Sequence, residues 1–401
     1  MRVLTVGNMF PPHHLGGYEQ DWAAGVAALQ AAGHDVKVLV SDYRQPGTSA
    51  EHGSPGDPPC VERSLRWYWH DHEFPHLTLR ERLAIERHNG AVLSRILDAF
   101  APEIVSWWPM GGMSLALVDQ VARAGVGALG IVYDDWMVYG PHVDGWQASW
   151  NGSRRPLAPL ASAVTGISTP SRFAGAARWL FASESVRAAA MRTVRGLRDT
   201  DLLPPGLDEV FLGPAAERDW DWHLVAPGRI DPRKGLATAV AALEHLPGAA
   251  TLTIVGGGDE HHRAELEQLA ERLSVRPRVV FAQARPRPQL AELYAEADAV
   301  LFPVVWAEPF GLVPLEAMGI GRPVVATGRG GSGEYLRDGE NCLLHEPEDP
   351  RGLAAAVARL AESPDLRARL REGGFATAPR YARTRWNERI VAEHEARAAP
   401  D

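Results

Sequence analysis

The stretch Glu308-Pro309-Phe310-Gly311-Leu312-Val313-Pro314-Leu315-Glu316 holds two carboxylates separated by seven residues. A strand-end loop is expected before it, and a helix is expected to begin near Leu312. A helix N-terminus presents unpaired backbone N–H groups that suit an anion or sugar hydroxyls, and Gly311 would let a ligand approach the backbone closely. Glu316, about a turn further on, would reach a polar diol. The alternative is a helix start with two solvated glutamates.

A second stretch, Gly228-Arg229-Ile230-Asp231-Pro232-Arg233-Lys234-Gly235, follows an expected strand and precedes an expected helix. An arginine gives phosphate a planar grip with several donors, and a lysine adds a compact charge. A cation pair beside a leaving diphosphate would stabilise the charge that develops as a glycosidic bond breaks. The alternative, when the stretch is taken alone, is a basic surface turn.

A third stretch places Gly16 and Gly17 between the first expected strand and the first expected helix. Adjacent glycines at a helix N-terminus suit a phosphate. The stretch is neither the Rossmann glycine pattern nor a Walker loop, which needs Gly-Lys-Ser/Thr. An ordinary turn between a strand and a helix explains it at least as well.

Two halves rich in alternating strands and helices must position these residues. Strand, loop, helix, strand is typical of a doubly wound parallel sheet, so the fold class expected is α/β. Pro and Gly concentrate at Leu203–Asp208, which predicts a linker. Domains are expected over 1–205 and 206–380, and residues 381–401 are expected to form a helix that crosses back to the first domain. Strands are expected at 3–6, 36–40, 104–106, 128–132, 163–167, 222–227, 251–255, 278–281, 299–302 and 323–326.

The stretch from Ser41 to Pro75 is rich in Pro, Gly, His and charge, and it carries three consecutive aromatic residues at Trp67, Tyr68 and Trp69. It is interpreted as an edge strand covered by a loop. The alternative is an excursion from the sheet that forms an aromatic wall or lid.

The composition sets outer limits on the function. A chain of 401 residues suits two domains, and a net charge of -9 argues against broad binding to nucleic acid. The two cysteines, Cys60 and Cys342, form no disulfide framework, which indicates a reducing compartment. No stretch offers the roughly 20 apolar residues that span a bilayer, so a cytoplasmic protein is expected. An arginine-rich amphipathic stretch at Arg172–Arg198 leaves peripheral membrane contact open.

Together the motifs resemble the pattern of glycosyltransferase family 4, and the Arg-rich, Lys-poor composition suggests a GC-rich bacterial source. The resemblance covers nearly the whole chain. It runs from the Gly-Gly loop through the Pro-Gly-Leu-Asp linker and the Gly-Arg to Lys-Gly stretch to the two glutamates, with a Val-Gly-Gly-Gly strand end at Val255–Gly258. It implies the GT-B architecture, in which two Rossmann-like domains face a cleft.

The resemblance also implies a role for each matching residue. Arg229 and Lys234 match the pair that binds the diphosphate, Glu308 matches the carboxylate on the donor sugar, and all three would be catalytic. The family retains the anomeric configuration by a front-face substitution and needs no metal, so no metal or other cofactor is expected beyond the nucleotide sugar. Donor contacts are implied for Gly16, Gly17, Gly257, Phe310, Gly311, Leu312 and Glu316.

One departure affects the acceptor side. Many relatives carry a His-Asp pair after a strand of the first domain, but this chain reads Val132-Tyr133-Asp134-Asp135-Trp136. Asp134 or Asp135 would then position the acceptor hydroxyl or help to deprotonate it; the alternative is an aspartate that only caps the next turn. Trp108 and Trp136 belong to an aromatic group that would form either an acceptor pocket or ordinary core.

The function expected is therefore transfer of a hexose-type sugar from a nucleotide-diphosphate sugar to an acceptor hydroxyl. A secondary metabolite, in natural product biosynthesis, is one acceptor class, and a cell-envelope polysaccharide or a lipid-linked sugar is the alternative. A sugar-nucleotide epimerase or a phosphorylase on the same fold is a further alternative. The donor base, the donor sugar and the oligomeric state stay open.

Overall fold

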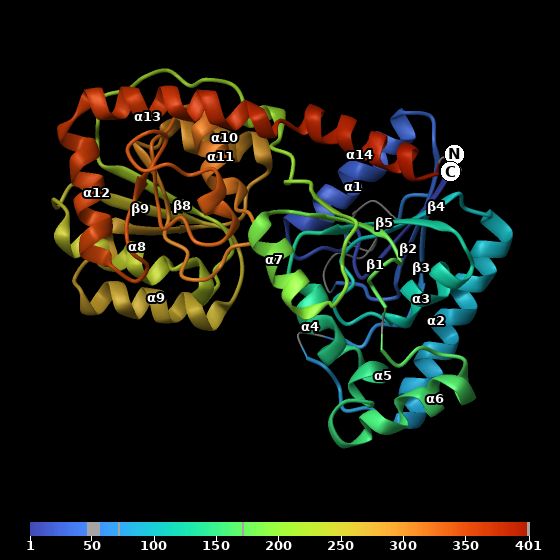
Figure 1. Cartoon of the computed structure of the whole chain (residues 1–401). Coiled ribbons are helices and arrows are strands. Elements are labelled where there is room, and N and C mark those ends of the chain that lie inside the picture. Colours follow the sequence, from blue (N-terminus) through green and yellow to red (C-terminus); the bar gives the residue numbers. More distant parts are fainter. Residues whose placement is uncertain (46–56, 71–72, 171, 399–401) are drawn as a thin grey trace. The chain divides into compact units, whose positions relative to one another are not determined.

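The computed structural model describes residues 1–45, 57–70, 73–170 and 172–398 (Figure 1). The chain divides into two compact units, which we call the first unit, Met1–Pro204 with the chain from Trp386 onward, and the second unit, Pro205–Arg385. The division falls inside the stretch that the sequence predicts to be a linker. The helix expected at the C-terminal end is α14, Arg383–Ala398, and residues 399–401 of that prediction lie outside the described residues.

The first unit is built on a seven-stranded sheet in the order β3-β2-β1-β4-β5-β6-β7. Its strands pair in parallel, and the central strands are apolar and buried because helices cover both faces. β3 forms one edge, in agreement with the edge-strand interpretation. The strands are β1 (Arg2–Gly7), β2 (Asp35–Ser41), β3 (Val61–Leu65), β4 (Ile104–Trp107), β5 (Gly127–Val132), β6 (Arg178–Phe181) and β7 (Thr200–Leu202).

The strand predicted at 163–167 is wrong, because helix α6 occupies Ala158–Thr165. Pro159 lies in the first turn, where its missing N–H does no harm, and Gly166 ends the helix with φ of 74°. The strand that pairs with β5 is instead β6. The helices are α1 (Gly17–Ala31), α2 (Leu79–Phe100), α3 (Ala116–Arg123), α4 (Trp136–Val143), α5 (Gly145–Ala148), α6 and α7 (Glu184–Thr193).

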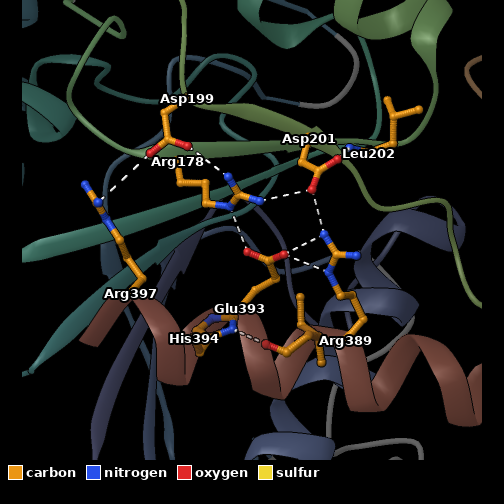
Figure 2. Close-up of polar contacts among 9 residues, drawn as sticks. Arg178, Asp199, Asp201, Leu202, Arg389, Glu393, His394 and Arg397 are labelled. Carbon is orange, nitrogen blue, oxygen red and sulfur yellow. Dashed lines mark hydrogen bonds and ion pairs between the residues drawn. The ribbon is translucent and has the colours of Figure 1, made fainter. Parts of the chain in front are cut away.

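Helix α14 packs on the first unit through an ion-pair network (Figure 2). The Arg178 guanidinium donates from Nε to Glu393 at 2.8 Å and from Nη2 to Asp201 at 3.0 Å. Arg389, one turn before Glu393, donates to the same Asp201 at 2.7 Å. Strands β6 and β7 are therefore joined to α14 by alternating charges, and the buried Trp386 adds apolar contact.

The second unit is built on a six-stranded parallel sheet in the order β10-β9-β8-β11-β12-β13. Helices cover both faces, with α8, α9 and α12 on one and α10, α11 and α13 on the other (Figure 1). The strands are β8 (His223–Pro227), β9 (Thr251–Val255), β10 (Val279–Ala282), β11 (Ala299–Phe302), β12 (Val324–Ala326) and β13 (Leu343–Leu344). The helices are α8 (Leu236–Ala242), α9 (Glu260–Arg272), α10 (Arg287–Glu296), α11 (Leu312–Ile320), α12 (Pro350–Glu362) and α13 (Pro364–Thr377).

The strand order defines where each sheet can bind a ligand. In the second unit the chain runs from β8 outward to β10, returns to β11 beside β8, and then runs outward to β13. The reversal lies between β8 and β11, and open α/β sheets bind ligands outside the carboxyl ends of the strands at such a point. In the first unit the same reversal lies between β1 and β4.

Within the described ranges, we find no helix with the length and apolar character needed to cross a membrane.

Candidate active site

The loops that follow β8 and β11 meet at the reversal point of the second unit. Lys234, from the loop after β8, donates from Nζ to Glu308 Oε2 at 2.8 Å. Trp306, from the loop after β11, donates from its indole nitrogen to the same oxygen, also at 2.8 Å. Both bonds end on Oε2, and Glu308 Oε1 makes no bond within the described chain. A carboxylate fixed at one oxygen keeps the other for a ligand hydroxyl.

A second ion pair shapes the loop that carries Lys234. Asp231 accepts from the Arg233 backbone N–H at 2.9 Å, and its two oxygens accept from Arg233 Nε and Nη2 at 3.0 and 2.6 Å. The Arg233 side chain holds the pKa of Asp231 down at about 2, with a smaller contribution from Arg229. The Arg233 guanidinium lies 4.5 Å from the centre of the Trp306 ring, a cation–π distance. Arg233 and Trp306 are not among the predicted site residues, although each lies within two residues of one that is.

Arg229 is the more exposed of the two predicted phosphate ligands. Its side chain is 50% exposed, and its Nη2 lies 3.9 Å from Asp231, against 19% exposure for Lys234. The guanidinium is therefore weakly held, and its donors can turn toward an anion at the carboxyl end of β8.

Glycines let the loops approach one another. Gly235 has φ of 66°, and a Cβ there would lie 1.9 Å from the Pro303 carbonyl oxygen. Gly311 has φ of 84° and caps α11, and its Cβ would lie 2.9 Å from the Phe302 ring. An L side chain is disfavoured at both positions. The half-buried Gly311 and Leu312 thus place the first N–H groups of α11 beside Glu308.

Phe310 has a packing role. Its ring is 3% exposed and lies 5.3 Å from Tyr335 and 5.4 Å from Tyr381 between ring centres. The side chain therefore holds the loop in place, and only its backbone is available to a ligand.

Glu316 lies on α11, and its partner comes from a helix that the motif does not include. The Tyr294 hydroxyl of α10 donates to Glu316 Oε2 at 2.8 Å. Burial raises the pKa of the Glu316 carboxyl, although the Tyr294 hydrogen bond and the Arg287 charge act in the opposite direction. The tyrosine thus orients a carboxylate that is 9% exposed. No sequence signal near Glu316 points to Tyr294.

The glycines after β9 differ in what they allow. Gly256 and Gly258 have φ of 151° and 153°, and a Cβ at either would meet backbone atoms of the loop after β8 at 2.0 or 2.4 Å. A Cβ at Gly257 would have no atom within 4 Å. Gly257 therefore lies open at the carboxyl end of the sheet, while its neighbours serve the packing of two loops.

In the first unit the predicted glycine loop precedes α1. The Gly16 N–H donates to Glu19 Oε2 at 2.9 Å, and Gly17 has open space around its Cβ position. Glu19 is 8% exposed, and burial raises the pKa of its carboxyl to about 7. One donor of this helix N-terminus is therefore satisfied by the chain itself.

The two aspartates after β5 differ in environment. Asp134 accepts from the Trp136 N–H at 3.1 Å and from the Tyr139 hydroxyl at 3.0 Å. Burial raises the pKa of Asp134 to about 6, and burial also raises the pKa of the half-buried Asp135. Asp134 thus accepts from the first N–H group of α4, and the N-cap position of that helix is Asp135, whose side chain makes no capping hydrogen bond.

The prediction that Trp108 and Trp136 line an acceptor surface is corrected, because both side chains have 0% exposure. Trp108 stacks on Trp22 with ring centres 5.9 Å apart, and Trp136 lies edge-on to Phe173 at 5.6 Å. Aromatic rings of this size contribute a large buried apolar area to a core. They form core.

Residues 215–377 match the model of the family described as Glycosyl transferases group 1. The D-inositol 3-phosphate glycosyltransferase of Acidothermus cellulolyticus is 37% identical over 199 residues, covering 45% of this chain and 44% of the relative. The chain thus matches less than half the length of that relative.

Two further proteins match along most of the chain. The glycogen synthase of Mycobacterium tuberculosis is 29% identical over 405 residues, covering 91% of this chain and 87% of the relative. The structure of Anabaena Alr3699/HepE in complex with UDP and glucose superposes with a TM-score of 0.69 at 20% identity, covering 98% of this chain and 99% of that one. The likeness confirms the predicted fold class, two Rossmann-like domains of the GT-B type, and within the second unit residues 215–377 are similar to the group 1 glycosyltransferases.

Proposed function

We propose that the chain is a retaining glycosyltransferase that moves a hexose-type sugar from a nucleotide-diphosphate sugar to an acceptor hydroxyl. The observation that carries the proposal is the 2.8 Å contact between Lys234 and Glu308 at the reversal point of the second sheet. It sets a cation for a leaving phosphate beside a carboxylate for sugar hydroxyls, where α/β sheets bind ligands. The names of the relatives and the UDP and glucose bound by HepE support a nucleotide-sugar donor.

In this proposal each charged group has one task. Lys234 and Arg229 bind the diphosphate and stabilise the negative charge that grows on it as the bond to the anomeric carbon breaks. Glu308 Oε1 accepts from the donor-sugar hydroxyls. Glu316 accepts from the ribose diol, with Tyr294 fixing its orientation, and the open backbone at Gly257, Gly311 and Leu312 supplies N–H donors.

Retention is proposed through a front-face substitution. Glu308 is not assigned as a covalent nucleophile, because Lys234 and Trp306 both donate to its Oε2 and its other oxygen is assigned to the donor-sugar hydroxyls. The departing phosphate oxygen then takes the acceptor proton on the face from which it leaves. The enzyme contributes position and electrostatic stabilisation.

The acceptor class is the finer part of the proposal. We infer a small hydroxylated acceptor, such as a secondary metabolite, and the relative named for D-inositol 3-phosphate supports a small acceptor in this family. The competing acceptors are a polysaccharide and a lipid-linked sugar. The remaining alternative is a reaction that changes the donor without any acceptor.

The test is a donor and acceptor matrix. Purified protein is incubated with UDP-, GDP-, ADP- and dTDP-hexoses and small or polymeric acceptors, and products are read by mass spectrometry and by the anomeric coupling in proton NMR. A product one hexose heavier that keeps the donor's anomeric configuration supports the proposal. An inverted product overturns retention. A donor changed with no acceptor consumed indicates an epimerase, and no turnover of any donor overturns the transferase assignment.

A further inference from the structure

A pocket lined by four arginines lies in the second unit, and none of the predicted site residues is among those that line it. Its volume is about 110 Å³, and its walls include Arg218, Arg322, Arg367 and Arg371 with two carboxylates, Glu217 and Asp298. A single water needs roughly 10–15 Å³ on this scale, so the pocket has room for an ion with several oxygen atoms. We call it the arginine pocket.

The charges of the arginine pocket do not cancel. Four arginines against two carboxylates leave two positive charges in a chain whose net charge is -9. The Glu217 side chain is 83% exposed and lies 3.6 Å from Arg371, so water screens its charge. The buried Asp298 lies 3.6 Å from Arg218 Nε and also accepts from two backbone N–H groups.

Arg322 is the buried member of the group, at 6% exposure. Its Nη2 donates to the carbonyl oxygens of Ala216, at 2.9 Å, and Ala295. Its Nε is buried and has no hydrogen-bond partner in the part of the chain that the structure describes. Carbonyl groups satisfy donors without neutralising charge, and a buried guanidinium with a spare donor is expensive. Burial and the Arg371 and Arg218 charges accordingly lower the pKa of Arg322.

The other arginines are held by neutral groups as well. Arg371 donates to the Ala215 carbonyl at 2.6 Å, and Arg367 donates to the Leu360 carbonyl at 2.6 Å and lies over the Trp220 ring at 5.5 Å. These contacts fix the guanidinium groups around the pocket in advance, and each leaves further N–H donors. Guanidinium groups held in place in this way can each donate two hydrogen bonds to the oxygens of a phosphate.

We propose that the arginine pocket binds a small multivalent oxyanion of the phosphate type, either inorganic phosphate or the phosphoryl group of a small metabolite. The inference does not depend on the proposed transferase function. The pocket includes Gly321 and Arg322, just past the C-terminal end of α11, whereas Glu308, Gly311 and Leu312 lie at its N-terminal end. A helix of 9 residues is about 14 Å long, so the two sites are separate.

The test is calorimetric titration of inorganic phosphate at constant ionic strength and pH 8, compared with chloride. Wild type is expected to bind one phosphate per chain. Arg371→Gln and Arg218→Gln should each weaken binding at least tenfold, about 1.4 kcal/mol. Two variants are used because Arg371 and Arg218 also donate to the backbone carbonyls of Ala215 and Glu296, and circular dichroism shows which variants fold. Arg369→Gln removes the same charge from an exposed position of α13 that does not line the pocket, and it should leave binding unchanged.

A donor-site variant separates this proposal from the proposed function. Lys234→Gln should retain full phosphate binding, because Lys234 is not in the arginine pocket. Loss of phosphate binding in Lys234→Gln would place the phosphate at the donor site and overturn the proposal. The proposal is also overturned if wild type shows no saturable phosphate binding, or if a folded Arg371→Gln or Arg218→Gln variant binds phosphate as tightly as wild type. A parallel titration with glucose 6-phosphate identifies the source: tighter binding than inorganic phosphate indicates a metabolite, and weaker binding indicates the free ion.

Discussion

Lys234 and Glu308, from two loops that are far apart in the sequence, meet in a 2.8 Å ion pair at the carboxyl ends of β8 and β11. The parallel order of the sheet makes this meeting possible, because β8 and β11 are neighbours. Each charge depends on the other, since the Lys234 and Glu308 side chains are only 19% and 12% exposed. Removal of one charge should therefore affect the other as well as the ligand.

Glu308→Gln should lower kcat for sugar transfer by about 100-fold or more, the usual effect of removing one preorganised electrostatic group. The amide oxygen still accepts from Trp306 and Lys234, so the fold should be kept while the negative charge is lost. Steady-state kinetics with the active donor measures the change in kcat. Glu340→Gln, on an exposed surface residue, is the control and should leave kcat unchanged. A Glu308→Gln enzyme of wild-type rate would refute the assignment.

Tyr294→Phe should weaken nucleotide binding by about 10-fold or more, since one hydrogen bond to a charged group contributes roughly 1.5–3 kcal/mol. The variant keeps the ring and removes the hydroxyl that orients Glu316. Calorimetric titration of the nucleotide diphosphate gives the Kd. Tyr381→Phe removes a hydroxyl from a tyrosine packed on Phe310, so it controls for the loss of a hydroxyl alone. Equal effects of the two variants would exclude a specific role for the Tyr294–Glu316 contact.

Gly256→Ala and Gly257→Ala should separate packing from binding. At Gly256 a Cβ would lie 2.0 Å from the Gly228 carbonyl oxygen, so alanine should destabilise the second unit by about 1–3 kcal/mol. At Gly257 a Cβ meets no atom, so alanine should leave the melting temperature nearly unchanged while raising the donor Kd. Thermal unfolding and donor titration measure the two effects. A Gly257→Ala protein with normal stability and normal donor affinity would remove Gly257 from the donor site.

Much of the fold could be predicted from the sequence, as could the grouping of Lys234 and Glu308 in one place, because the informative residues are local. The strand Thr251–Val255 is a short β-branched and apolar run that ends in glycines, and the charged loops after β8 and β11 follow similar runs. The segment 163–167 gives the wrong prediction because a short apolar segment fits a helix as well as a strand. Two contacts could not be predicted because they depend on tertiary packing and leave no local sequence pattern. They are the hydrogen bond from Tyr294 to Glu316 and the stacking of Trp108 on Trp22.

The stability of the first unit should depend on pH through the buried Glu19. Its pKa is raised from 4.5 to about 7, so between these pH values the folded state holds a proton that the unfolded state has released. Stability contributed by Glu19 should therefore fall as pH rises through this window, by up to about 3 kcal/mol. Glu19→Gln, which still accepts from the Gly16 N–H, should lose that dependence and become more stable than wild type above pH 7. Urea unfolding at pH 5 and pH 8 measures the difference, with the exposed Glu388→Gln as control. A stability gap between wild type and Glu19→Gln that stays constant with pH would show that Glu19 is ionised in the folded protein throughout.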